Sequence, residues 1–174
     1  MKLKLFCETP SGRTNTKVSD AFFVRNRDVG DPLHRDFLIS GEGSLMALEF
    51  SIASDTSYYR TKVKSSLPIG SREALTMRMY WPLPESLTAK QQGVNRGAFV
   101  DMIGNYEATT AERIFQLAHG ELTIDSVKSK KLYLSIDATF RSLAGDSLRF
   151  DGNVRVRERK QFKFSNTSYH LKDR

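Results

Sequence analysis

Apolar and polar residues alternate most regularly near the C-terminus, in two runs on either side of residues 142–147 (Ser-Leu-Ala-Gly-Asp-Ser). One set occupies every second position of both runs: Leu132, Leu134, Ile136, Ala138 and Phe140, then Leu148, Phe150, Gly152, Val154 and Val156. A period of two places such residues on one face of a strand, whereas same-face positions of a helix recur at three and four. The pattern predicts a β-hairpin with one buried and one wet face. Phe162 and Phe164 continue the same every-second-position pattern after Val156, so the second strand is expected to continue toward the C-terminus.

Shorter runs of the same kind occur along the rest of the chain. Strands are expected at residues 2–7, 21–25, 45–52, 58–63, 76–81 and 98–103. Residues 8–19 and 65–71 contain Gly, Pro and Ser and are typical of loops, and Pro82 and Pro84 are expected to end the strand at 76–81. Residues 86–92 are expected to form one or two helical turns, with Ser86 as N-cap. Residues 110–118 fit either a short helix or a strand, and the alternation that continues to Val127 favours the strand.

Together these runs predict an all-β fold. We expect an antiparallel β-sandwich or a partly open barrel of about 8–10 short strands, with at most one or two short helices. The length of 174 residues suits one domain spanning residues 1–174.

Charge is unevenly distributed along the chain. The formal net charge is +7; residues 1–87 carry 12 Lys+Arg against 10 Asp+Glu, and residues 88–174 carry 15 against 10. The second half therefore contributes +5 of the total. A basic surface favours acidic partners, whether nucleic acid, polysaccharide or acidic protein.

The predicted hairpin places part of this positive charge on one face of its two strands. Five basic residues of the second strand and its continuation share the wet face, and the first strand adds three residues to it: Arg149, Arg155, Arg157, Arg159 and Lys163, with Lys131, Tyr133 and Arg141. Guanidinium groups bind phosphate and carboxylate in a bidentate manner, and an aromatic ring among them suits nucleic acid. The alternative is a solvated outer face whose charges prevent edge-to-edge aggregation.

Residue patterns typical of catalysis, cofactor binding or metal binding are absent from the sequence. His34, His119 and His170 are far apart in sequence, and the lone Cys7 can form neither an internal disulfide nor a cysteine-rich zinc site. Gly41 to Ser44 lacks the Lys-Ser/Thr of a phosphate loop and suits a β-turn or bulge. We therefore predict no catalytic, cofactor-binding or metal-ligating residues, and a buried apolar role for Cys7.

Five short motifs in the C-terminal half resemble the ending of small, uncharacterised bacterial surface or periplasmic β-sandwich domains. They are Gly-Ala-Phe-Val from Gly97, Gly-Glu-Leu-Thr-Ile-Asp-Ser-Val from Gly120, Leu-Ser-Ile-Asp-Ala-Thr-Phe from Leu134, the single Gly145, and Phe-Asp-Gly-Asn-Val-Arg-Val from Phe150. The similarity covers about residues 97–156, and it departs from the pattern where Asp137-Ala138 replace a glycine and where a lipobox is absent. It implies an extracytoplasmic adhesion or accessory role.

The sequence leaves three functions open. The first is a non-enzymatic β-sandwich binding or accessory protein; the second is a structural subunit of an assembly such as a virion, tail tube or filament, which would self-associate; the third is a nucleic-acid-binding module. Met1 to Phe6 resembles the start of a signal peptide, but the apolar stretch stops at Cys7. As written, the chain is expected in the cytoplasm, or outside it if a signal peptide has been removed. No apolar run reaches the ~18 residues of a membrane span.

Overall fold

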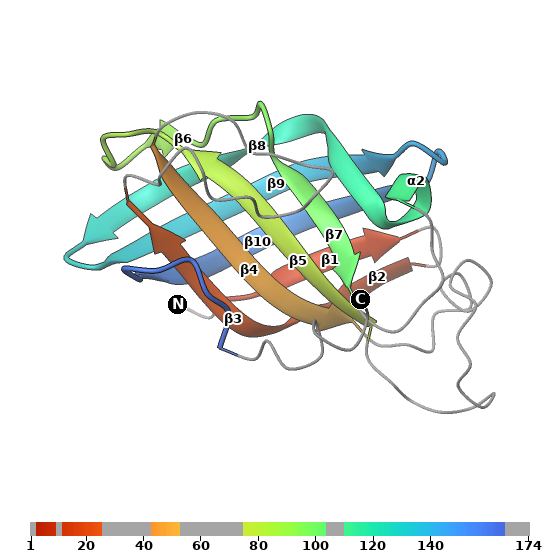
Figure 1. Ribbon diagram of the computed structural model, residues 1–174, viewed down its shortest axis with the longest axis horizontal. Helices are drawn as coiled ribbons and strands as arrows, with labels where there is room; N and C mark the ends of the chain where they lie inside the picture. The colour runs from red at the N-terminus through yellow and green to blue at the C-terminus, as the bar shows by residue number, and fades with distance from the viewer. Residues whose placement is uncertain (1–2, 10–11, 26–42, 53–74, 104–109, 166–174) are drawn as a thin grey trace.

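Ten β-strands form one sheet in the computed structural model, which describes residues 3–9, 12–25, 43–52, 75–103 and 110–165 (Figure 1). The strands and the single helical turn are β1 (Leu5–Thr9), β2 (Gly12–Asn15), β3 (Lys17–Val24), β4 (Ser44–Ile52), β5 (Leu75–Leu83), β6 (Gln91–Gln92), β7 (Phe99–Ile103), α2 (Thr110–Arg113), β8 (Ile114–Lys128), β9 (Lys131–Ser142) and β10 (Ser147–Glu158). The prediction of an all-β fold is confirmed.

Seven of these strands close into a barrel in the order β3, β4, β5, β7, β8, β9 and β10. All neighbours in this ring are antiparallel except β10 and β3, which run parallel and meet only at Arg157 opposite Phe22 and Glu158 opposite Phe23. Strands β1 and β2 extend the sheet from the other half of β10, and β6 pairs with β8. Of the two architectures that the sequence predicted, the structure is therefore the barrel. The short parallel pairing of β10 with β3 closes the ring, which the sequence predicted to be partly open.

The predicted C-terminal hairpin is confirmed as β9 and β10. Leu134 lies opposite Val154 and Phe140 opposite Leu148, and burial alternates along both strands. Gly152 has a φ of +140°, and a Cβ on it would overlap the carbonyl oxygen of Lys4, the residue just before β1. Glycine is therefore required at this position of β10, where the backbone of Lys4 and Leu5 leaves no room for a side chain.

Four local predictions need correction. Residues 8–19 are not one loop, because they contain β2 and the start of β3. Residues 86–92 form no helical turn; Lys90 has a φ of 64°, which ends a turn before β6. Strand β5 continues through Pro82, whose neighbour across the sheet is Leu45. Strand β10 ends at Glu158, so Phe162 and Phe164 do not belong to it.

The ambiguous residues 110–118 contain both expected structures. One helical turn, α2, ends at Arg113, and β8 begins at Ile114. The strands expected at 2–7, 21–25, 45–52, 76–81 and 98–103 overlap β1, β3, β4, β5 and β7. The strand predicted at 58–63 and the loop at 65–71 lie outside the described residues.

The barrel interior is apolar and tightly packed. The rings of Phe50, Phe140 and Phe150 meet edge to face, with centroids 5.4 and 5.8 Å apart, and Trp81 packs on Phe140 at 5.6 Å. Edge-to-face packing is the preferred arrangement of buried aromatic pairs. The buried Cys7 joins this core, as the sequence predicted.

A second apolar cluster covers the outside of the barrel wall on β3, β4, β5 and β7. Its buried members are Phe22, Val24, Leu45, Ala47, Tyr80, Phe99, Ile114 and Phe164. Strand β4 is consequently buried on both faces for most of its length. The sequence predicted one apolar face for this strand, and the structure shows that its other face is also covered.

Candidate anion-binding surface

Four cations and one tyrosine gather on the outer wall at one end of β8, β9 and β10. The strand register places Lys131 opposite Lys128 on one side and Arg157 on the other, and Tyr133 opposite Ser126 and Arg155. We name Lys128, Lys131, Tyr133, Arg155 and Arg157 the basic end. Lys128, Arg155 and Arg157 are exposed, and Lys131 and Tyr133 are half-buried.

Two local features build the basic end. A register shift between Ile124 and Ser126 moves β8 by one residue relative to β9, so that Lys128 lies opposite Lys131. The two-residue turn after Lys128 has Ser129 at a φ of 55°, which brings β9 back beside β8 at once. The Lys128 ammonium then lies 5.5 Å from the Tyr133 ring centroid, within cation–π range.

The cations of the basic end form no ion pair in the part of the chain that the structure describes. None of the ion pairs found there involves Lys128, Lys131, Arg155 or Arg157. Glu158, the nearest carboxylate along β10, instead pairs with Arg25 at 3.0 Å. Asp125, on β8, is engaged by the Ser135 hydroxyl, so neither of these two nearby carboxylates is paired with a cation of the basic end.

Arg149 shares the face of Arg155 but has different surroundings. Its guanidinium lies 3.1 Å from Asp137 and 3.6 Å from Glu8. The charge of Asp137 and the hydrogen bond to it raise the pKa of Arg149 above its ordinary value. The sequence placed Arg149 with the other cations, whereas the structure shows it compensated by carboxylates.

Three carboxylates lie side by side across the same wall. Glu121, Asp137 and Asp151 occupy one row of β8, β9 and β10, which we name the acidic row. Like charges opposite one another destabilise a sheet. Polar partners offset this repulsion: Arg13 binds Asp151 at 2.7 Å, and the Gln92 amide donates to Glu121 at 2.6 Å.

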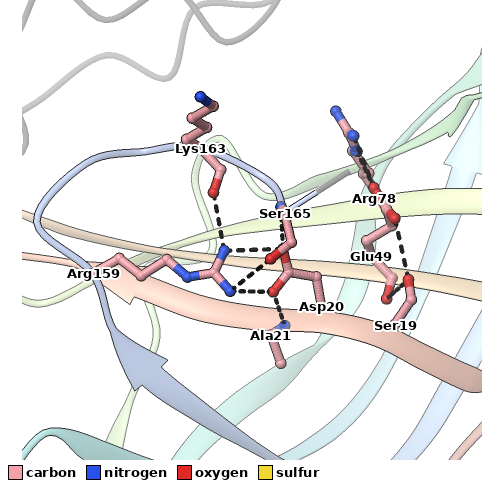
Figure 2. A network of polar contacts seen from close by, with 8 residues as sticks. All are labelled: Ser19, Asp20, Ala21, Glu49, Arg78, Arg159, Lys163 and Ser165. Carbon is pink, nitrogen blue, oxygen red and sulfur yellow. Dashed lines mark hydrogen bonds and ion pairs between the residues drawn. The ribbon is translucent and has the colours of Figure 1, made fainter. Parts of the chain in front are cut away.

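Three predicted residues lie away from the basic end. Arg141 is ten residues from Lys131 along β9, which corresponds to about 33 Å in a strand, and it is flanked by Gln116 and Ser147. Arg159 and Lys163 follow the end of β10, where the chain leaves the sheet (Figure 2). Strand parity no longer applies there, so the expectation that these residues extend the stripe is wrong.

Sequence reasoning missed a row of charged residues beneath the outer apolar cluster. Asp20, Glu49, Arg78 and Asp101 face one another in register across β3, β4, β5 and β7, and we name them the buried charge row. Each of the four is less than a tenth exposed. The available signal was a single charged residue in each of three apolar strands, at Glu49, Arg78 and Asp101.

Ion pairs compensate this row along its length. Arg78 Nε donates to Glu49 at 2.9 Å, and Arg113 Nε lies 3.0 Å from Asp101. Asp20 receives the Arg159 guanidinium (Figure 2). Burial pushes the pKa of Asp20 upward, but the hydrogen bonds from Arg159 and from the backbone N–H of Ser165 outweigh it and hold the pKa below its ordinary value.

The described residues offer little for covalent or metal chemistry. Burial raises the pKa of the Cys7 thiol to about 12, so its nucleophilic thiolate is scarce at neutral pH. His119 lies exposed on β8 opposite Thr139, while His34 and His170 are outside the described residues. Within the described ranges, no three His, Cys, Asp or Glu side chains are grouped to hold a metal ion. In that part of the chain, no helix has the length and apolar character to cross a membrane.

Comparison with family models, curated proteins and solved structures finds no match to this chain. The resemblance of residues 97–156 to bacterial surface domains therefore stays a prediction.

Proposed function

We propose that this chain is a non-enzymatic binding or accessory protein that holds an anionic partner on the basic end. One observation carries the proposal. Lys128, Lys131, Arg155 and Arg157 project from three hydrogen-bonded strands of a closed barrel, with no carboxylate partner among the described residues. Holding cations on a rigid sheet lowers the entropy lost when a ligand orders them.

The spacing of the basic end suits a polyanion better than a single small anion. Arg155 and Arg157 are two residues apart on one strand face, which separates their Cα atoms by about 7 Å. Lys131 and Lys128 continue the positive charge across two further strands. A chain of phosphates, sulfates or carboxylates can contact several of these groups at once, and each guanidinium can bind one of them in a bidentate manner.

The acidic row orients such a partner. Asp151 lies four residues from Arg155 along β10, about 13 Å away, and Asp137 and Glu121 continue the negative charge across β9 and β8. A polyanion lying along the strands would approach these carboxylates. The proposal therefore places it across the strands, over Lys128, Lys131 and Arg157.

A titration with three labelled polyanions tests the proposal: a single-stranded oligonucleotide, heparin and poly-glutamate. Fluorescence anisotropy is followed at several salt concentrations. The variant R155A/R157A should lose about tenfold or more in affinity for the polyanion that binds best, with a shallower salt dependence. The relative affinities of the three probes decide among nucleic acid, polysaccharide and acidic protein.

The matched control is R96A/R141A, which removes the same charge from two exposed positions outside the basic end. Its affinity should stay within about twofold of the wild type, because long-range electrostatics is screened beyond about 8–10 Å at physiological salt. Equal losses in the two double variants would contradict a defined site. Failure of all three probes to bind would reject the proposal.

A further inference from the structure

Residues 159–165 leave the end of β10 and cross the outside of the barrel wall, and we name them the strap. Figure 2 shows Arg159, Lys163 and Ser165 of the strap gathered around Asp20 of β3. Two aromatic side chains fasten it: the Phe164 ring lies 5.1 Å from the Phe22 ring, and the Phe162 ring lies 5.2 Å from it. Phe164 is only 5% exposed. The strap therefore completes the outer apolar cluster.

Charge holds the strap as well. The Arg159 guanidinium donates to both carboxylate oxygens of Asp20 and to the carbonyl of Lys163 at 2.9 Å. The backbone N–H of Ser165 donates to Asp20 at 2.8 Å. The Arg78 guanidinium lies 3.7 Å from the Phe164 ring centroid, so the buried charge row touches the strap directly.

The strap is bound in the manner of a peptide ligand rather than of a strand. Within the described residues, its one backbone–backbone hydrogen bond runs from Arg159 N–H to the Phe23 carbonyl, at the very start of the segment. Beyond Arg159, the contacts with the barrel use side chains or the Ser165 N–H. Release of the segment at Arg159 would therefore break one backbone–backbone hydrogen bond, together with the contacts to Asp20 and Phe22.

The strap supplies the cation that one buried carboxylate of its receiving surface needs, Asp20. Residues 159–165 carry Arg159, Lys160 and Lys163 and no acidic residue. In the buried charge row, Glu49 pairs with Arg78 and Asp101 with Arg113, whereas Asp20 pairs with Arg159 of the strap. Charge complementarity of this kind fixes the register of a docked segment and disfavours wrong partners. An identical strap from another copy would find the same aromatic contacts and the same carboxylate.

We propose that the outer surface of β3, β4 and β5 is a docking site for the strap of a second copy of this chain, so that two copies exchange residues 159–165. The contacts in the exchanged pair are those seen within one chain, so only protein concentration and the path around Arg159 decide which form is populated. The proposal uses none of the residues of the basic end.

Cross-linking between two full-length variants tests the exchange. Ser19 and Ser165 are both exposed and flank Asp20 and its partner, whereas the native Cys7 is buried and its thiol unreactive. One copy carries S19C and one affinity tag; the other carries S165C and a second tag. A short bismaleimide should join the two tags covalently, with a yield that rises with protein concentration. A chain carrying both substitutions should cross-link within itself at low concentration, which verifies the reach of the reagent.

Two further measurements separate exchange from chance contact. A synthetic peptide of residues 159–165 in excess should suppress the mixed product at least severalfold, whereas a peptide with both phenylalanines replaced by alanine should not. Light scattering should show a dimer fraction that increases with concentration. A monomer mass at every concentration, together with no mixed cross-link while the internal control reacts, would overturn the proposal. A mixed product that the native peptide fails to reduce would also overturn it.

Discussion

Arg78 and Glu49 form an ion pair across β5 and β4 in which Nε and Oε2 lie 2.9 Å apart, while the two side chains are only 5% and 6% exposed. Such a pair loses most of its hydration on folding, so its Coulomb energy and its desolvation cost nearly cancel. Breaking it from one side leaves a buried charge without a counter-charge. The fold therefore requires both members of the pair, or neither, at this point of the outer wall.

We expect Glu49→Gln to lower the free energy of unfolding by about 3–5 kcal/mol, the usual loss when one member of a buried ion pair is removed. The double variant E49L/R78M should recover much of this loss, because it replaces both charges with apolar groups of similar size. Urea denaturation followed by Trp81 fluorescence measures both. A single variant as stable as the wild type would contradict the burial of this pair.

Stability at low pH should depend on Asp20. Its pKa is lowered in the folded state, so the ionised carboxylate stabilises the fold above its unfolded pKa of about 3.9. This stabilisation is lost as the pH falls through the lower, folded pKa. The variant D20N lacks the titrating group, so its stability should change less than that of the wild type between about pH 5 and pH 2. Thermal unfolding at a series of pH values tests this, and parallel curves for the two proteins would refute it.

Gly152→Ala should be far more harmful than Gly145→Ala. Both glycines have a positive φ, +140° and +95°. An added Cβ at position 152 meets the Lys4 carbonyl and the Leu5 backbone, whereas at position 145 it meets nothing within 4 Å. Backbone strain alone costs about 1–3 kcal/mol, which is our expectation for G145A, and G152A should exceed it through separation of β1 from β10. Chemical denaturation measures the free energy of unfolding of both variants. Equal decreases for G152A and G145A would contradict the prediction, because they would show that β1 can move away from β10 without a further loss of stability.

Cys7 should resist alkylation in the folded protein. A thiol pKa of about 12 in place of 9.0 reduces the thiolate population by about three orders of magnitude at pH 8, and burial blocks the reagent as well. Iodoacetamide should therefore label Cys7 only after denaturation, as mass spectrometry can follow. Rapid labelling under native conditions would mean that β1 detaches from the barrel, because Cys7 pairs with Phe150 of β10.

The predictions that rest on local alternation agree with the structure. A period of two placed Leu134 and Val154 on the buried face of one hairpin, and their backbones are direct neighbours across β9 and β10. The same parity correctly grouped Arg155 with Tyr133. These relationships need only the pleat of two adjacent strands joined by a short turn, so they are encoded within a few tens of residues.

The incorrect predictions about the basic face concern residues whose position depends on where a strand ends or shifts register. Arg159 and Lys163 keep the parity of Arg157, but the chain leaves the sheet after Glu158, where the pairing of β10 with β3 stops. Lys128 was missed for a related reason. Its membership of the basic end depends on the register shift between Ile124 and Ser126, which parity counting along one strand does not reveal.

The sequence by itself determined that this chain is all-β and which side chains of the C-terminal hairpin face inward. Tertiary structure alone decided that the barrel closes through a short parallel contact between β10 and β3, and that the acidic row separates Arg149 from Arg155 and Arg157. It also decided that Arg78, paired with Glu49, is buried against Phe164. The physical reason is the range of the interactions. The pleat of a strand acts between neighbours in sequence, whereas strand order and the burial of an outer face depend on segments more than a hundred residues apart, such as Asp20 and Arg159.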